Sequence, residues 1–184
     1  MKQIQLPVFM RVNVDVDPTT GQGSTECTPE EYHKYVDRGM AVVKSTLAIE
    51  SLLNWFLRLS LFREIDEDAE FVCGHLLESS HLSFSSKRKL FSAILERDSL
   101  LSGKEKQNIE KQLSFVERYR NAFAHGSISA VHDKFILKYF SSTHHEENLD
   151  DDFWLKIETS FNQASNTIQA LNVQLSATQT DSEK

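Results

Sequence analysis

The segment from Thr28 to Phe62 carries apolar residues at helical spacing along its whole length, and this pattern limits the folds open to the chain. Thr28-Pro29-Glu30-Glu31 is a capping box with proline at the first helical position, so a helix begins there. Two neighbouring apolar stripes follow, one from Tyr35 to Phe56 and the other from Val36 to Leu57. Because adjacent stripes bury a helix over much of its surface, the segment predicts the central helix of a bundle.

Four further segments have the periodicity or the boundary signals of helices, at about residues 66–79, 85–97, 104–124 and 149–176. Residues 4–16 alternate as a strand does, and residues 134–142 are rich in β-forming side chains. The sequence therefore predicts a mainly α fold, a bundle of five helices with a small two- or three-stranded β element. We expect the two strand segments to pair, because an isolated strand leaves its backbone groups without partners.

With 184 residues the chain is long enough for one domain with a core of its own. We expect an N-terminal strand and loop over residues 1–29 and a flexible polar tail over residues 177–184. Between them lies a helical domain over residues 30–176, with a β-hairpin insertion near residues 131–149. Within that hairpin, His144-His145-Glu146-Glu147 lacks the spacing of metal ligands, and we interpret it as a solvated turn.

Composition narrows the functional classes. No apolar run approaches the length of a membrane span, and the two cysteines lack a metal or redox spacing, so we expect a cytoplasmic protein with reduced thiols. The formal net charge of −7 argues against a protein that coats nucleic acid non-specifically. It leaves room for a local basic site, because basic residues gather in two helical segments, at Lys87, Arg88, Lys89 and Arg97 and at Arg118 and Arg120.

The fourth predicted helix ends in the sequence RNAFAHG, from Arg120 to Gly126. Arg120 falls within the apolar stripe formed by Ile109, Leu113, Val116 and Phe123. An arginine on such a stripe either reaches water or meets a partner. His125 lies in the last turn, and Gly126 is placed as the left-handed residue that ends the helix. By position alone an ordinary helix end is the simpler interpretation, and a small active site is the alternative.

Glu50 and Asn54 interrupt the second apolar stripe of the first helix, one turn apart. They could lie at the rim of that stripe, in water. Alternatively they satisfy a buried cation, for which Arg120 is the candidate. We therefore predict a hydrogen bond between Arg120 and Glu50 or Asn54, made directly or through one water molecule.

The run Arg120-Asn121-Ala122-Phe123-Ala124-His125, followed by Gly126, resembles the RNxxAHG motif of the HEPN superfamily. The segment Leu82-Ser83-Phe84-Ser85-Ser86-Lys87 is similar to the one that precedes the motif helix in many bacterial and phage-defence members. The resemblance in helical order covers about residues 30–175 and implies a five-helix HEPN-like bundle. The N-terminal strand and the hairpin are additions to that core.

The resemblance implies a metal-independent endoribonuclease, often a toxin or phage-defence effector, that acts as a homodimer with one shared RNA-cleaving cleft. Arg120 would hold the scissile phosphate, Asn121 would orient the reacting groups, and His125 would be the general acid or base. Attack by the 2′-hydroxyl would give a cyclic phosphate and a free 5′-hydroxyl. The resemblance implies no cofactor and no membrane. The expected partners are RNA, a second copy of the chain and a neutralising antitoxin or defence-system protein.

Physical chemistry agrees with these roles in part. The planar fork of arginine suits a phosphate, and histidine exchanges protons near neutral pH. Arg118 shares a helix face with Asn121 and His125, so Arg118 and Lys87 are candidates for binding the RNA backbone, while Glu50 and Asn54 would support Arg120. The acidic balance of the chain is the main objection to an enzyme that acts on RNA. The alternative is a non-catalytic HEPN-like module for nucleotide binding or dimerisation, against which the intact motif argues.

Overall fold

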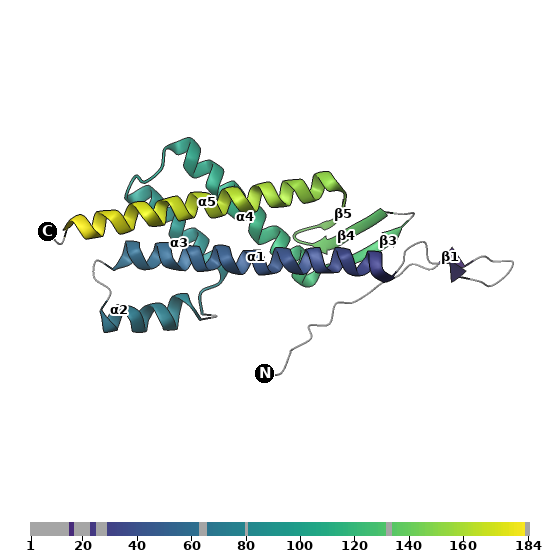
Figure 1. Cartoon of the computed structure of the whole chain (residues 1–184), viewed down its shortest axis with the longest axis horizontal. Helices are drawn as coiled ribbons and strands as arrows, with labels where there is room; N and C mark the ends of the chain where they lie inside the picture. Colours follow the sequence, from purple (N-terminus) through teal and green to yellow (C-terminus); the bar gives the residue numbers. More distant parts are fainter. Residues whose placement is uncertain are drawn as a thin grey trace. The chain divides into compact units, whose positions relative to one another are not determined.

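The computed structural model describes residues 15–16, 23–24, 29–62, 66–79, 81–131 and 134–182. This part of the chain is mainly helical, with five α-helices and a small three-stranded antiparallel sheet, which confirms the predicted fold class (Figure 1). The elements follow in the order β1 (Asp15–Val16), β2 (Gly23–Ser24), α1 (Pro29–Leu61), α2 (Glu67–Val72), the π-helical turn η1 (Cys73–Leu77), α3 (Phe84–Arg97), α4 (Gly103–His125), β3 (Ser127–Val131), β4 (Lys134–Phe140), β5 (His144–Asn148) and α5 (Asp151–Ser182).

Side-chain caps explain where four of these helices begin. The Asp66 carboxylate accepts a hydrogen bond from the backbone N–H of Ala69 at the start of α2, at 2.8 Å. Ser83 caps α3 and Asp150 caps α5 in the same way. At α4 a capping box forms, because the Glu105 carboxylate accepts from Ser102 N at 3.0 Å while the Ser102 hydroxyl accepts from Glu105 N at 3.4 Å. These local signals place the helix starts within a few residues of the predicted ones.

The three-stranded sheet differs from the prediction in two respects. Its strand order is β3-β4-β5, so both edges of β4 are occupied and the predicted pairing of β4 with the N-terminal strand is wrong. In the described part of the N-terminus, β1 pairs with β2 instead, and residues 4–14 lie outside the described residues. Residues 144–148, interpreted as a turn, form β5; the turn is shorter and lies at Ser141–Thr143, where Ser141 N donates to Thr143 O at 3.0 Å.

The chain divides into two compact units. Unit 1 holds the residues up to Val43 together with Arg118–Lys156, and unit 2 holds Lys44–Glu117 together with the residues from Ile157 onward. The boundary falls inside α1, α4 and α5, so each of these helices contributes one end to each unit. The sequence carries no signal for this division, because no helix is interrupted at the boundary.

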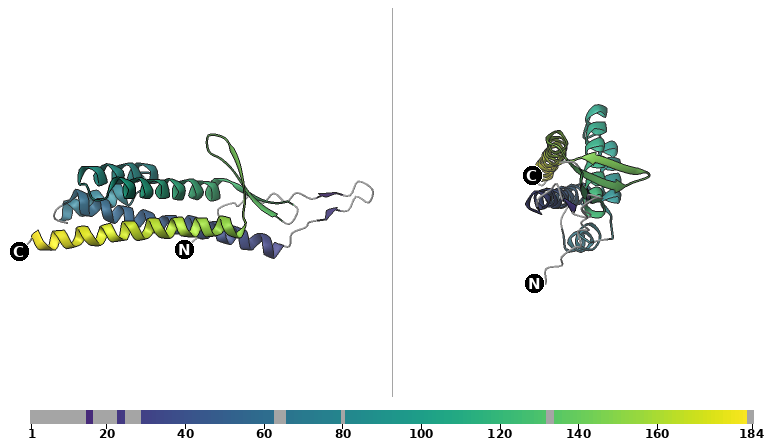
Figure 2. Two further views of the ribbon diagram at one scale, coloured as in Figure 1. Left: turned by 90° about the horizontal axis from the view of Figure 1, so that it is seen from above. Right: turned by 90° about the vertical axis from the view of Figure 1, so that its right-hand side faces the viewer.

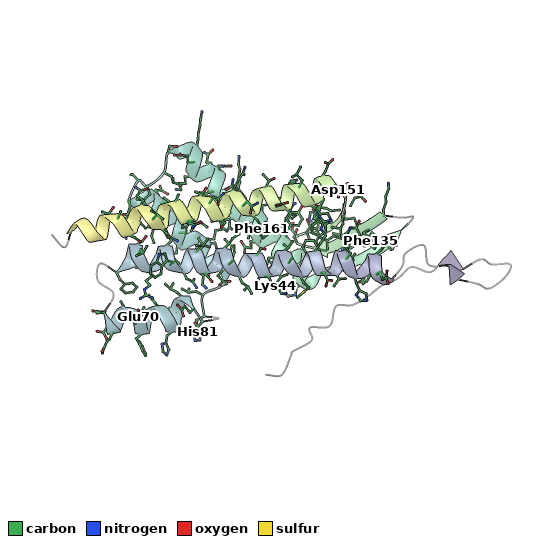
Figure 3. All side chains as sticks on the ribbon, in the orientation of Figure 1. Lys44, Glu70, His81, Phe135, Asp151 and Phe161 are labelled. Atoms are coloured by element: carbon green, nitrogen blue, oxygen red, sulfur yellow. The ribbon has the colours of Figure 1, made fainter. Side chains whose placement is uncertain are left out.

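Aromatic rings form the core of unit 1. The ring of Phe123 on α4 stacks on Trp154 of α5 at 5.7 Å between centroids, and Tyr35 of α1 stacks on Phe135 of β4 at 4.0 Å. Figure 3 marks Phe135 on β4 and Asp151 at the start of α5. A Cβ atom at Gly39 would lie 2.6 Å from the Phe123 ring, so glycine allows α1 to approach α4 closely here. The sheet and three helix ends therefore share one core.

Unit 2 is a helical bundle whose core combines aliphatic side chains with phenylalanine rings. Within it α1 and α5 lie side by side and run in the same direction, while α4 runs in the opposite direction (Figures 1 and 2). The Asn172 amide donates to the carbonyl of Leu52 at 3.1 Å and ties α5 to α1. The predicted stripes supply most of the buried residues, which include Ile49, Leu53, Phe56 and Leu57 of α1, Ile109, Leu113 and Val116 of α4, and Phe161, Ala164 and Ile168 of α5. The helix α5 continues to Ser182, past the predicted start of a polar tail.

By length and composition alone, α1 could cross a membrane. An 18-residue window within Glu30–Leu61 has a mean hydropathy of 1.2, in contrast to the expectation that no apolar run approaches the length of a membrane span. A mostly buried core helix passes the same test; 33% of this window is buried, and α1 supplies Ile49, Leu53 and Phe56 to the core of unit 2.

Candidate functional site

The residues of the RNAFAHG motif lie at the C-terminal end of α4, in unit 1. Asn121 and His125 are exposed, and Arg120 is half-buried with its Nη1 donating to Asn121 Oδ1 at 3.2 Å. The buried face of α4 passes through Tyr119 and Ala122, which places Arg120 at its edge. The structure therefore brings the three predicted catalytic residues to one accessible helix end.

Gly126 follows α4 for a reason other than the predicted one. Its φ does not lie in the left-handed region, so the expected left-handed helix stop is wrong. A Cβ atom at this position would lie 2.3 Å from the carbonyl oxygen of Ala122 and 2.7 Å from that of Lys138. Glycine is required for two reasons: a side chain would meet the last turn of α4 itself, at Ala122, and it would meet β4, which passes close to this helix end within unit 1.

An open pocket of about 520 Å³ adjoins His125. Its walls come from the end of α4 and from the sheet, and they include Ser127, Lys138, Phe140 and His144. Phe140 is 69% exposed, and its ring meets that of His144 edge-on at 5.2 Å. The Lys138 ammonium pairs with Glu146 at 2.9 Å at the surface. His125 thus lines the same pocket as the Lys138–Glu146 ion pair and an exposed aromatic pair.

Sequence reasoning missed the role of residues 144–147. As part of β5 they alternate in direction: His145 and Glu147 are half-buried, whereas His144 and Glu146 are exposed. The His145 ring stacks on Tyr139 of β4 at 5.0 Å between centroids. No signal in the sequence pointed to this strand, because all five of its residues are polar and show no period-two alternation of apolar and polar side chains.

Glu147 binds three other side chains, those of Arg118, Tyr119 and Tyr139. It accepts hydrogen bonds from the hydroxyl groups of Tyr119 at 2.5 Å and Tyr139 at 2.6 Å, and it pairs with Arg118 at 3.4 Å. Burial, together with the bond to Glu147, raises the pKa of Tyr119 to about 12. Arg118, a predicted RNA contact, is therefore held by Glu147 and Tyr119, although its side chain stays 43% exposed.

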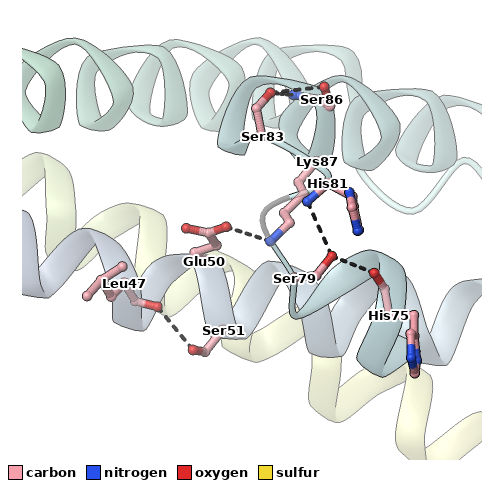
Figure 4. A network of polar contacts seen from close by, with 9 residues as sticks. All are labelled: Leu47, Glu50, Ser51, His75, Ser79, His81, Ser83, Ser86 and Lys87. Atoms are coloured by element: carbon pink, nitrogen blue, oxygen red, sulfur yellow. Dashed lines mark hydrogen bonds and ion pairs between the residues drawn. The ribbon is translucent and has the colours of Figure 1, made fainter. Parts of the chain in front are cut away.

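The other predicted RNA contact, Lys87, belongs to unit 2 and is only 2% exposed. Its Nζ donates to Glu50 Oε1 at 2.5 Å, as Figure 4 shows. Because Lys87 is buried and paired, it does not offer a free charge to an RNA backbone. The positive charge near the start of α3 is compensated by carboxylates, since Arg88 also pairs with Glu117 at 3.2 Å.

The two supporting residues, Glu50 and Asn54, also belong to unit 2. Glu50 holds Lys87, and the Oδ1 atom of Asn54 is buried without a hydrogen-bond partner in the described part of the chain. Arg120 belongs to unit 1, where it contacts Asn121. The expected bond between Arg120 and Glu50 or Asn54 stays a prediction.

A second pocket, of about 500 Å³, lies in unit 2. One wall is a single face of α1 with Glu50, Asn54 and Arg58, and the other walls come from η1 and from Lys87 of α3. No sequence pattern pointed to this pocket, because its polar residues come from three separate helical segments.

The described residues contain no group of three or more histidine, cysteine or acidic side chains arranged to hold a metal ion. Comparison with the models of known protein families, with curated proteins and with solved structures finds no match to this chain.

Proposed function

We propose that this protein is a metal-independent endoribonuclease of the HEPN type, with Arg120, Asn121 and His125 as its catalytic residues. The observation that carries the proposal is the accessibility of this motif at the end of α4, with His125 lining an open pocket. A guanidinium and an imidazole at an accessible helix end suit binding of a phosphate and transfer of a proton. The proposed setting is cytoplasmic, as a toxin or phage-defence effector with a neutralising partner.

In the proposed reaction the 2′-hydroxyl oxygen of the RNA attacks the adjacent phosphorus, and the bond from phosphorus to the 5′-oxygen breaks. Arg120 neutralises the charge on the phosphate oxygens, and Asn121 keeps the guanidinium in place through their mutual hydrogen bond. His125 either accepts the proton of the 2′-hydroxyl or donates one to the leaving 5′-oxygen. The products are a cyclic phosphate and a free 5′-hydroxyl.

A homodimer is part of the proposal. A single imidazole cannot accept one proton and donate another in the same step, so a second copy of the chain would supply the second His125. Two-fold pairing would also bring two copies of Arg120 and His125 to the RNA. The second copy matters because the chain has a net charge of −7 and one motif offers little positive charge.

The substrate would be single-stranded where it is cleaved. The exposed rings of Phe140 and His144 line the same pocket as His125. Aromatic side chains beside a phosphate-binding group typically stack on unpaired bases, which a duplex does not present. We therefore expect cleavage in loops or ends and little cleavage of duplex RNA.

The test is incubation of the pure protein with total RNA and with labelled transfer RNA in the presence of a chelator. We expect cleavage to products with a cyclic or 3′ phosphate, and a loss of about 10² to 10⁴ in rate for His125→Ala. Arg120→Lys should restore little, because a point charge does not replace the bidentate fork. His75→Ala and Arg97→Lys, at exposed positions in unit 2, are the matched controls.

Three results would overturn the proposal: full activity of His125→Ala, loss of activity with chelator, or a monomer of 21.1 kDa in light scattering at micromolar concentration. The non-catalytic module for nucleotide binding or dimerisation would then take its place.

A further inference from the structure

The pocket in unit 2 has features that packing alone does not explain. A buried ion pair, Lys87 with Glu50, forms part of its wall, with Lys87 at 2% and Glu50 at 20% exposure (Figure 4). Burying such a pair costs several kcal/mol in desolvation, and apolar residues of similar size commonly stabilise a fold as well or better. Stability alone therefore does not explain why this ion pair is present, and a role in binding does.

Both partners of this pair keep unused hydrogen-bonding capacity. The Lys87 ammonium carries three N–H donors and has one hydrogen-bond partner in the described part of the chain, Glu50. The Glu50 carboxylate likewise has lone pairs beyond the one that Lys87 uses. The wall of the pocket thus presents the N–H donors of Lys87 next to the oxygen acceptors of Glu50.

Further polar atoms on the same wall lack partners. Asn54 Oδ1 and Arg58 Nε, one turn apart on α1, are buried without hydrogen-bond partners in the residues described. Buried polar groups in native proteins are almost always bonded, so an acceptor and a donor without partners at one pocket point to a ligand or ordered water. The opposite wall is the π-helical turn η1, a geometry that often marks functional sites.

The charges of the pocket balance. Among its lining side chains Glu50 and Glu78 are acidic, and Arg58 and Lys87 are basic. Both cations already pair with carboxylates, Lys87 with Glu50 and Arg58 with Glu70, so the described residues leave no unpaired cation in the pocket for an anion, and the pocket favours a neutral molecule. At the rim, Trp55 is 43% exposed and Leu47 is 53% exposed, which suits a flat or apolar surface. The pocket volume lies in the range typical of small-molecule sites.

We propose that this pocket binds a small, neutral, planar heterocycle with an amide-type edge, in which an N–H donor lies beside a C=O acceptor. The carbonyl oxygen of the ligand accepts a hydrogen bond from Lys87, its N–H donates to Glu50, and its ring lies against Trp55. The proposal does not rest on the proposed ribonuclease activity, because its readout is binding and none of the pocket residues is in the RNAFAHG motif.

The experiment is isothermal titration calorimetry of the full chain with inosine and with uridine, each against its N-methylated counterpart, 1-methylinosine or 3-methyluridine. Methylation removes the N–H of the amide edge and leaves the ring and the carbonyl in place. We expect at least one of the two nucleosides to bind, and its methylated counterpart to bind about tenfold or more weakly, as the loss of one hydrogen bond to a charged group implies.

Two variants locate the binding. Lys87→Met combined with Glu50→Leu removes both charges together, so that neither is left buried alone, and it should weaken binding about tenfold or more. Ser51→Trp places an indole in the pocket from an exposed position of α1 and should block binding without disturbing the core. Phe71→Ala, at an exposed position of α2 outside the pocket, is the control and should bind as the parent protein does.

The proposal is overturned if neither nucleoside binds at millimolar concentration or if methylation leaves the affinity unchanged. It is also overturned if Ser51→Trp binds as well as the parent protein, because the ligand would then lie elsewhere. Since the readout is binding of a nucleoside, a failure here is distinct from a failure to cleave RNA.

Discussion

Replacing Glu147 by alanine should destabilise unit 1, whereas replacing the adjacent Glu146 should have little effect. Both residues lie on β5 and carry the same side chain, but they point to opposite sides of the strand. Glu147 is half-buried and accepts hydrogen bonds from Tyr119 and Tyr139. Glu146 is 61% exposed and, among the described residues, pairs with Lys138 alone, which is itself 39% exposed. Both substitutions remove the same side chain, so a difference in stability between them reports the effect of burial and of the tyrosine hydrogen bonds.

The magnitude follows from the contacts. A hydrogen bond to a charged group contributes about 1.5–3 kcal/mol, so the two tyrosine bonds together contribute about 3–6 kcal/mol. Tyr119 keeps a bond from Arg118 after the change, which favours the lower end of the range, about 3 kcal/mol. The pair of Arg118 with Glu147 spans 3.4 Å and adds little because Arg118 is partly exposed. For Glu146→Ala the surface pair predicts a loss below about 1 kcal/mol.

The two tryptophans of the chain allow the measurement to be made on unit 1. Trp154 is buried in unit 1, and Trp55 lies in unit 2. In a Trp55→Phe background, the fluorescence of Trp154 during urea unfolding reports the stability of unit 1, and circular dichroism follows the helices of both units. With an m-value of about 1–3 kcal/mol/M, a loss of about 3 kcal/mol moves the midpoint by about 1–3 M.

A double-mutant cycle isolates the bond itself. Tyr139→Phe and Glu147→Gln should each destabilise unit 1, and their combination should cost clearly less than the sum. Glu147 would not have this stabilising role if the losses in unfolding free energy for Glu147→Ala and Glu146→Ala differed by less than about 0.5 kcal/mol, or if the cycle were additive.

Two further predictions concern Tyr119 and Gly126. Tyr119 is neutral when protonated, and folding raises its pKa from 10.0 to about 12, so the stability that it contributes is fully present below pH 10 and is lost as the pH rises toward 12. In a pH titration, the tyrosinate absorbance that the parent protein shows and Tyr119→Phe lacks should appear near pH 12. A midpoint near pH 10 would contradict this. Gly126→Ala should lower the free energy of unfolding by about 1–3 kcal/mol in thermal unfolding, because its Cβ would meet two backbone oxygens. The control is Gly74→Ala, which has nothing within 4 Å of its Cβ and should be neutral or stabilising. Equal effects of the two changes would count against the clash.

Local sequence signals were sufficient for the helices. The capping box at Thr28 predicted the start of α1, and the periodicity from Trp154 onward predicted α5, because capping and helical spacing involve residues only a few positions apart. The same local reasoning placed Arg120, Asn121 and His125 together at the end of α4, where the structure also has them.

Contacts between distant segments were not predictable in this way. Lys87 was expected at an RNA backbone, and only packing of α3 on α1 revealed Glu50 as its partner, 37 positions away. Glu147 was expected in solvent, and only the pairing of β5 with β4 turned it toward Tyr119 and Tyr139. Capping and periodicity are properties of a single segment, whereas the partner of a buried charge depends on which segments the folded core brings together. Tertiary structure alone therefore decided the strand order, the ion pairs and the pocket in unit 2.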